Sequence, residues 1–130
     1  MNITETIKGL ADLACLSPAS EEDISAAEAE LGLSFANDYK EYVGTFGAIS
    51  ASGVELTGVV PFPRLSVVEV TKREREGNEK IPSDMYVIEN TGMEGLVILQ
   101  TCDGTVYSAV PHNEPKRLFA SLADYLQSIK

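Results

Sequence analysis

Apolar residues in the first 47 positions repeat with the period of a helix. The first predicted helix covers residues 2–14, with an apolar stripe at Ile3, Ile7, Leu10 and Ala14. A second helix is predicted to start at Ser20, whose hydroxyl can cap the first turn, and to end at Gly32. Ser34 is the expected cap of a third helix, which has an apolar face at Tyr39, Tyr42, Val43 and Phe46. We therefore expect a helical layer with its aromatic residues in the core.

From residue 53 onward the pattern becomes that of strands. Residues 53–57 alternate as a strand would, and an antiparallel meander is predicted from three β-rich runs, 85–89, 96–100 and 105–109. Asp103-Gly104 is predicted to be a two-residue turn, because glycine tolerates a positive φ. Pro111 and Pro115 are expected to end the sheet. A last helix is predicted after its cap, Ser121, with Leu122, Leu126 and Ile129 pointing inward.

Residues 66–77 fit either a strand or a helix. The β-branched start of this segment favours a strand, whereas its Ser66-x-x-Glu69 capping box and glycine stop favour a helix, which we prefer. Mixed charges over residues 72–80 predict a solvated helix face, and the alternative is a recognition edge beside the Pro61-Phe62-Pro63 loop. The chain is thus predicted to be one α+β domain, residues 1–130. Its antiparallel sheet would be surrounded by N-terminal helices, one interposed helix and a C-terminal helix.

The composition fits such a domain. Apolar residues make up 44% of the 130 positions, which is enough to bury the core of one domain. The sequence has no apolar run long enough for a membrane span, and its first residues lack the basic start and apolar stretch of a signal peptide. We therefore expect a cytoplasmic location. Cys15 and Cys102 are too few for a disulfide framework and are expected to be free thiols.

The charge of the chain narrows its possible partners. Twenty acidic and ten basic residues give a formal net charge of −10. Residues 1–63 hold ten acids and two bases, whereas residues 64–130 hold ten acids and eight bases. This balance argues against direct binding to nucleic acid or to an anionic membrane, both of which attract basic surfaces. An acidic half suits a basic protein partner, although solubility alone would also account for it.

Motifs that carry catalytic chemistry are missing from the sequence. The single histidine, His112, and two distant cysteines do not supply a zinc site or a placed nucleophile–base pair. The phosphate-binding loop Gly-x-x-x-x-Gly-Lys-Ser/Thr and the Gly-x-Ser-x-Gly elbow do not occur. No feature selects two of the twenty carboxylates as an acid–base pair. We therefore predict that the protein is not an enzyme and has no catalytic residues, no cofactor and no metal.

Three early segments resemble the signature of the Smi/Knr cell-wall-regulator family, part of the SUKH superfamily. The three segments are Glu28–Leu33, Asp38–Val43 and Phe46–Ser50. The family signature has, in this order, an acidic residue before Leu-Gly, an acidic residue before Tyr-Lys, and an apolar residue followed by glycine. Later blocks agree with the family's strands and closing helix: 54–58, 86–90, 95–100, 103–107 and 121–126. The resemblance covers about residues 20–127. Phe35-Ala36 stands where the family usually has Leu-Pro.

The resemblance implies both a fold and a function. Family members have one α+β domain, and bacterial members resemble immunity proteins that bind and neutralise a cognate toxin domain, often a nuclease, without catalysis of their own. We therefore expect a non-catalytic immunity protein; the alternative is a regulatory protein-binding module without a toxin partner. A carboxylate-rich surface could occupy the basic groove of a nuclease in place of phosphates. The residues predicted to contact the toxin are Glu21, Glu22, Asp23, Glu30 and Asp38.

Overall fold

Two antiparallel sheets and the helices around them form a single α+β domain, as the sequence predicted. The computed structural model describes residues 2–129. In chain order the helices are α1 (Ile3–Lys8), α2 (Glu21–Leu31), α3 (Asn37–Phe46), α4 (Val67–Gly77) and α5 (Leu122–Ser128). One sheet has the order β1-β2-β3, formed by Ala14–Cys15, Ile49–Ala51 and Val54–Glu55. The other has the order β4-β5-β6-β7, formed by Tyr86–Asn90, Val97–Gln100, Val106–Ala109 and Lys116–Phe119.

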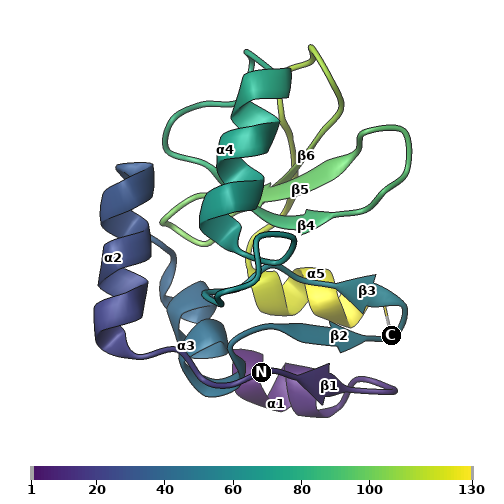
Figure 1. The fold of residues 1–130 in the computed structure, drawn as a ribbon. Coiled ribbons are helices and arrows are strands. Elements are labelled where there is room, and N and C mark those ends of the chain that lie inside the picture. Colours follow the sequence, from purple (N-terminus) through teal and green to yellow (C-terminus); the bar gives the residue numbers. More distant parts are fainter. Residues whose placement is uncertain (1, 130) are drawn as a thin grey trace.

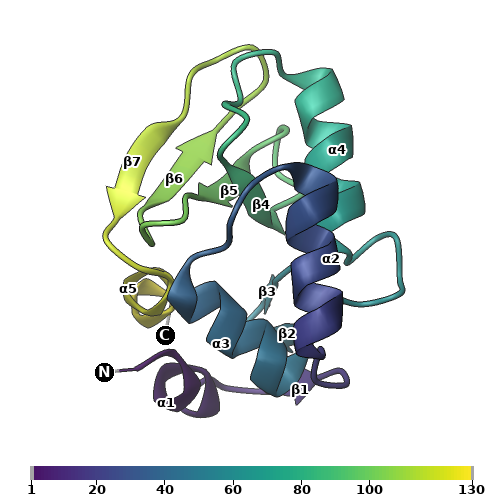
Figure 2. The same cartoon turned by 90° about the vertical axis from the view of Figure 1, so that its left-hand side faces the viewer.

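The two sheets lie toward opposite ends of the molecule, and α2 contacts helices from both ends (Figure 1). Helix α4 lies beside the four-stranded sheet, and α1 and the short sheet lie at the opposite end (Figure 1). Helix α2 packs against both α3 and α4 along one flank, which Figure 2 shows from the side. The N–H of Thr57 donates to the carbonyl of Ile88 at 2.9 Å, so the chain that leaves the short sheet is bonded to the long one.

Three of the predicted helix caps are confirmed. The hydroxyls of Ser20, Ser66 and Ser121 accept hydrogen bonds from backbone N–H groups three residues later, at 3.1, 3.5 and 3.1 Å. Each bond satisfies an amide that has no partner within the helix. Gly32 ends α2 with a left-handed φ of 68°, a conformation that glycine adopts at little cost. The ambiguous segment is therefore helical, as α4.

The prediction of a first helix over residues 2–14 is wrong beyond Lys8. Ala14 pairs with Ser50 and Cys15 with Ile49, so the end of that segment is strand β1. The N–H of Ser52 donates to the carbonyl of Ala11 at 2.8 Å. These backbone bonds to a distant strand replace the helical ones, and the apolar stripe could not reveal them.

The predicted cap of the third helix is also wrong. Helix α3 begins after Ala36, which has no capping side chain of its own. Its start is satisfied from elsewhere: the N–H of Ala36 donates to the hydroxyl of Tyr86 at 2.9 Å, and the N–H of Phe35 donates to the Glu28 carboxylate at 2.8 Å. The predicted apolar face is confirmed, since it is buried at Tyr39, Tyr42, Val43 and Phe46.

The predicted meander is confirmed as β4, β5 and β6, but the sheet does not end there. Strand β7 follows the second proline and pairs Lys116 with Ser108. The hairpin between β5 and β6 has a three-residue loop, residues 102–104, rather than the predicted two-residue turn. The N–H of Thr101 donates to the carbonyl of Thr105 at 3.1 Å and closes this loop. Gly104 has a φ of 96°, so its expected role is confirmed. Strand β2 was not predicted, and β3 is shorter than the predicted strand over 53–57.

The centre of the core is a group of aromatic side chains whose hydroxyls are all bonded. The rings of Phe35, Tyr39 and Tyr86 lie 4.8 to 5.1 Å apart between centroids. The Tyr39 hydroxyl lies 2.9 Å from that of Thr57, and the Tyr42 hydroxyl donates to the Thr57 carbonyl at 2.6 Å. Burial raises the pKa of both Tyr39 and Tyr42, so these hydroxyls stay protonated. This core fixes α3, against which α2 packs.

Candidate protein-binding surface

The outer face of α2 carries most of the predicted contact residues. Ile24, Ala27 and Leu31 point into the core at helical spacing, so the acids between them face outward. The exposed acids on this helix are Glu21, Glu22, Asp23 and Glu30. The first three lie in the first turn, where the positive end of the helix dipole stabilises negative charge. These four residues are hereafter the acidic face of α2.

The charges of the acidic face are mostly unpaired. Glu30 bonds to Lys72 of α4 at 3.1 Å, and both side chains are exposed. Across residues 2–129, no lysine or arginine forms an ion pair with Glu21, Glu22 or Asp23. An exposed carboxylate without an ion-pair partner stays hydrated, and its negative potential is not neutralised. It is therefore available to a cation of another molecule.

Asp38, the fifth predicted contact residue, does not belong to this face. Its side chain is half-buried in the first turn of α3. One carboxylate oxygen accepts from the Gln100 side-chain amide at 3.0 Å, and the other accepts from the Leu122 N–H at 2.8 Å. Burial raises the pKa of Asp38, and these hydrogen bonds oppose the shift. The carboxylate thus joins α3 to β5 and to the start of α5, a role that the sequence analysis missed.

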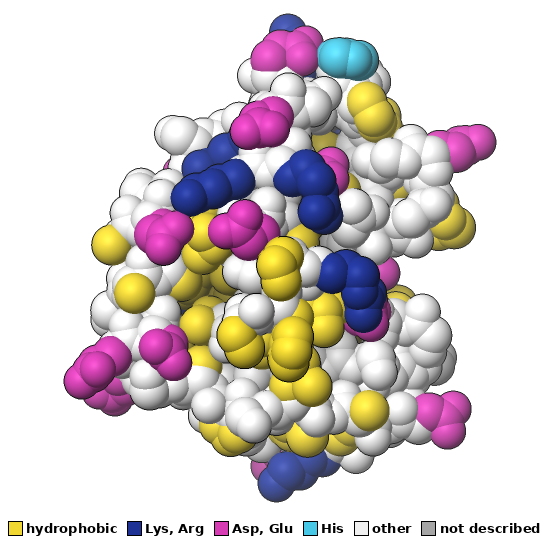
Figure 3. All heavy atoms as spheres, in the orientation of Figure 1, with side chains coloured by type: hydrophobic (Ala, Val, Ile, Leu, Met, Phe, Trp, Pro, Cys, Tyr) yellow, Lys and Arg dark blue, Asp and Glu magenta, His cyan; other side chains and the backbone are white. Residues whose placement is uncertain are grey.

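An open groove runs beside the acidic face. Its first part, of about 400 Å³, lies between α2 and the chain from Val59 to Glu69. A second part, of about 670 Å³, shares Asp23 and Val59–Pro61 with the first and continues to residues 15–19 and Phe62. We call the two parts together the α2 groove. Figure 3 shows hydrophobic side chains gathered in the middle of this side of the molecule, with acidic side chains along α2 and basic ones above.

The basic residues of α4 differ in role, although the sequence predicted one solvated face. Lys72 and Arg73 are exposed, as predicted. Arg75 is half-buried, and its guanidinium donates to the carbonyls of Ser83 at 2.8 Å and Met85 at 3.3 Å. Burial lowers the pKa of Arg75. This arginine therefore holds the chain before β4 against α4 and is not free to meet a partner.

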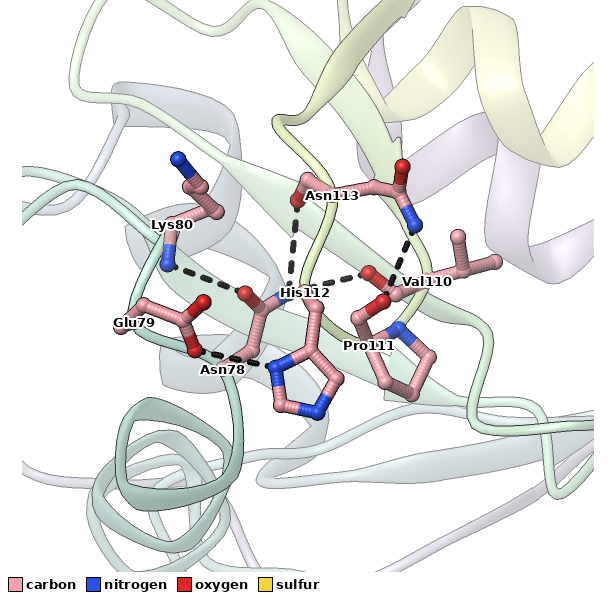
Figure 4. A network of polar contacts seen from close by, with 7 residues as sticks. All are labelled: Asn78, Glu79, Lys80, Val110, Pro111, His112 and Asn113. Atoms are coloured by element: carbon pink, nitrogen blue, oxygen red, sulfur yellow. Dashed lines mark hydrogen bonds and ion pairs between the residues drawn. The ribbon is translucent and has the colours of Figure 1, made fainter.

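A second polar cluster ties the end of α4 to the loop between β6 and β7 (Figure 4). The buried Asn78 amide donates to the carbonyl of Val110 at 3.0 Å, and its oxygen accepts from the Lys80 N–H at 3.0 Å. Beside it, His112 Nδ1 lies 3.1 Å from the carboxylate of Glu79, and both side chains are exposed. His112 is thus on the surface. The bonds of Asn78 run to backbone groups, so the cluster fixes loop positions.

In the part of the chain from residue 2 to residue 129, no three His, Cys, Asp or Glu side chains group as metal ligands would. Of the helices in that part, none is long and apolar enough to cross a lipid bilayer. Cys15 and Cys102 are free thiols, as predicted, and both are exposed.

Fold and surface together define a small acidic α+β domain with a charged helix face beside an apolar groove. The family model SUKH_5, described as SMI1-KNR4 cell-wall, matches residues 3–129, and the chain therefore belongs to this family. The match confirms the resemblance and extends it to nearly the whole chain. SUKH proteins are generally immunity proteins of polymorphic toxin systems, and the family is generally non-catalytic. No curated protein matches the chain.

Proposed function

We propose that this protein is an immunity protein that binds and neutralises a cognate toxin domain. The acidic face of α2 is the proposed contact, and the toxin domain is basic, as a nuclease would be. The observation that carries the proposal is the unpaired carboxylates of Glu21, Glu22 and Asp23, on a chain with a net charge of −10. The general role of SUKH proteins supports it.

The physical argument concerns the groove of a nuclease. Such a groove is positively charged because it must hold phosphates. Carboxylates on a rigid helix can occupy the same positions as phosphates and exclude the substrate. Opposite potentials also steer two proteins together and raise the rate of association. Asp38 is left out of the proposed contact because its two oxygens already accept hydrogen bonds within the fold.

The experiment begins with affinity capture of the tagged protein from its own host's lysate, with identification of bound proteins by mass spectrometry. A captured protein is then expressed with and without this protein. Cell death that co-expression prevents supports the proposal. A partner without toxicity contradicts it and favours the regulatory module.

Charge reversal tests the contact face. Glu22→Lys, Asp23→Lys and Glu30→Lys together should abolish protection, because a basic toxin would then meet like charge. A matched control reverses three exposed acids outside α2, Glu76, Asp84 and Glu114, and so changes the net charge equally. Protection should survive in the control. Equal loss in both variants would show that total charge, and not the acidic face, matters.

A further inference from the structure

The α2 groove contains two large apolar side chains that are exposed. Phe62 is 52% exposed and Leu16 is 37% exposed, and both line the second part of the groove. The same part is also lined by apolar residues of two segments: Pro18 and Ala19 from one, and Val59, Val60 and Pro61 from the other. Single exposed apolar residues are normal on a protein surface, but a contiguous patch bordered by charge is typical of an interaction site.

The charged residues that line the groove are acidic, and one of them, Glu30, pairs with Lys72 of α4. Asp23, Glu30 and Glu69 line its first part, and within residues 2–129 neither part is lined by a lysine or arginine. Asp23 is common to both parts and so lies where they meet. Among the described residues 2–129, no cation pairs with Asp23 or Glu69. A ligand that filled the groove with apolar groups would therefore meet unpaired carboxylates at its edge.

The wall that carries Phe62 is held by backbone hydrogen bonds. The carbonyl of Phe62 accepts from the N–H groups of Leu65 at 2.9 Å and Ser66 at 2.8 Å. Gly58 donates to the Leu65 carbonyl at 2.8 Å and accepts from the Val67 N–H at 2.9 Å. These bonds close the loop into a turn, so the backbone that carries Phe62 is already ordered. A preformed anchor loses little conformational entropy on binding.

We propose that the α2 groove binds a basic amphipathic segment of the partner protein, an inference that rests on the proposed function. Apolar residues of the segment pack against Phe62, Leu16 and Val60, and its lysines or arginines pair with Asp23 and Glu69. From Asp23 to Glu30 the groove follows eight residues of α2, about 10 Å of helix. Two turns of a partner helix have that length. The groove adds apolar anchors, which fix the position of a partner that the acidic face attracts.

The test uses a synthetic helix of about 18 residues with leucines on one face and lysines on the other. Cys15 lines the groove, whereas Cys102 lies in the β5–β6 turn, so the two thiols report on different places. A small environment-sensitive fluorophore is attached at Cys15 in a Cys102→Ser variant, and at Cys102 in a Cys15→Ser variant. The proposal predicts a saturable change at Cys15 and none at Cys102.

Variants of the protein and of the peptide then separate the two parts of the proposal. Phe62→Ala should weaken peptide binding about tenfold or more, as loss of a central anchor does. Met93→Ala, an exposed apolar residue outside the groove, should leave it within about twofold. Because Phe62 and Met93 are both exposed, the variants should keep their thermal unfolding midpoints. Replacing the peptide's leucines with glutamine, or its lysines with glutamate, should each abolish the signal.

Four results would overturn the inference. Equal binding of the glutamine peptide would mean that charge alone acts, and equal binding of the glutamate peptide would mean that the segment need not be basic. A Cys15 signal that depends on protein concentration without peptide would identify a second copy as the occupant. The fourth result separates this inference from the proposed function: a Phe62→Ala variant that still protects against the toxin at low expression leaves immunity standing and removes the groove.

Discussion

Carboxylates on helix α2 and carboxylates that contact the four-stranded sheet lie in opposite environments. On α2, Glu21, Glu22 and Asp23 are exposed and have no ion-pair partner within residues 2–129. At the sheet, Glu89 is 7% exposed and accepts a hydrogen bond from the Tyr125 hydroxyl, and Asp38 accepts from β5 and α5. Some acidic residues of this domain are therefore exposed to solvent, whereas others accept hydrogen bonds inside the fold.

The difference shows which acids can meet a partner. A buried carboxylate with donors around it holds elements together, and removing it leaves those donors without a partner. An exposed carboxylate contributes little to stability and is free to act in binding. Burial accordingly raises the pKa of both Asp38 and Glu89. The first of the following variants tests the close contact between Gly58 and Gly47, and the later ones test this division between acids.

The largest effect is expected from Gly58→Ala. A Cβ at this position would lie 1.8 Å from the Gly47 carbonyl oxygen, so the backbone would have to move apart. We expect a loss of more than about 3 kcal/mol in the free energy of unfolding, measured by urea denaturation. Gly44→Ala is the control, because its Cβ would lie 3.9 Å from Ile24 and a helix-interior alanine stabilises by about 0.5–1 kcal/mol. Similar unfolding free energies for Gly58→Ala and Gly44→Ala would contradict the close contact between Gly58 and the Gly47 carbonyl.

A smaller effect is expected where the two kinds of acid are compared directly. Asp38→Asn keeps the shape but turns an NH₂ group toward either Gln100 or Leu122, both of which donate. The variant should lose about 2 kcal/mol of unfolding free energy. Glu22→Gln, on the exposed face, should stay within about 0.5 kcal/mol of the wild type. If both changes had the same effect on chemical unfolding, the division between internal and external acids would fail.

The smallest effect is a change in pH dependence. Burial raises the pKa of Glu89, and the hydrogen bond from Tyr125 opposes the shift. Over the interval between the unfolded and folded pKa values, the folded state holds a proton that the unfolded chain has lost. Glu89 therefore favours folding at low pH, and this contribution is lost as the pH rises from about 4 through the raised pKa.

Glu89→Gln removes this group while keeping an oxygen that accepts from Tyr125. The unfolding free energy of the wild type should fall relative to that of the variant as the pH rises through this interval. Tyr125→Phe should steepen the fall, because the bond that lowers the Glu89 pKa is lost. Urea unfolding at a series of pH values measures both. Parallel curves of unfolding free energy against pH for the wild type and Glu89→Gln would contradict this prediction. They would mean that Glu89 has the same pKa in the folded and unfolded states.

Local rules were sufficient where the hydrogen-bond partner lies nearby in the chain. The caps Ser20, Ser66 and Ser121 each bond three residues ahead, and the helical stripe of α3 depends on its own residues alone. Partners farther away could not be inferred. The end of α1 depends on the pairing of Ala14 with Ser50, and the start of α3 depends on Tyr86, fifty residues beyond Ala36. Strand β7 has exposed residues and therefore shows no apolar alternation.

The candidate site divides in the same way. Helical spacing alone places Glu21, Glu22, Asp23 and Glu30 on the outer face of α2. Asp38 is also an acidic residue in the first turn of a helix. Its hydrogen bond to the Leu122 N–H spans 84 positions, however, and cannot be inferred from the sequence. The α2 groove is formed by three separate segments, so only the folded chain reveals it. The exposed Phe62 between two prolines was the one local signal that pointed to it.

The acidic face is tested most directly by the salt dependence of toxin binding. The dissociation constant of the captured toxin is measured from low to high salt for the wild type and for the variant reversed at Glu22, Asp23 and Glu30. We predict that wild-type binding weakens steeply as salt screens the attraction, and that the variant binds weakly with a nearly flat dependence. An unchanged affinity and slope in the variant would contradict the account and place the interface elsewhere.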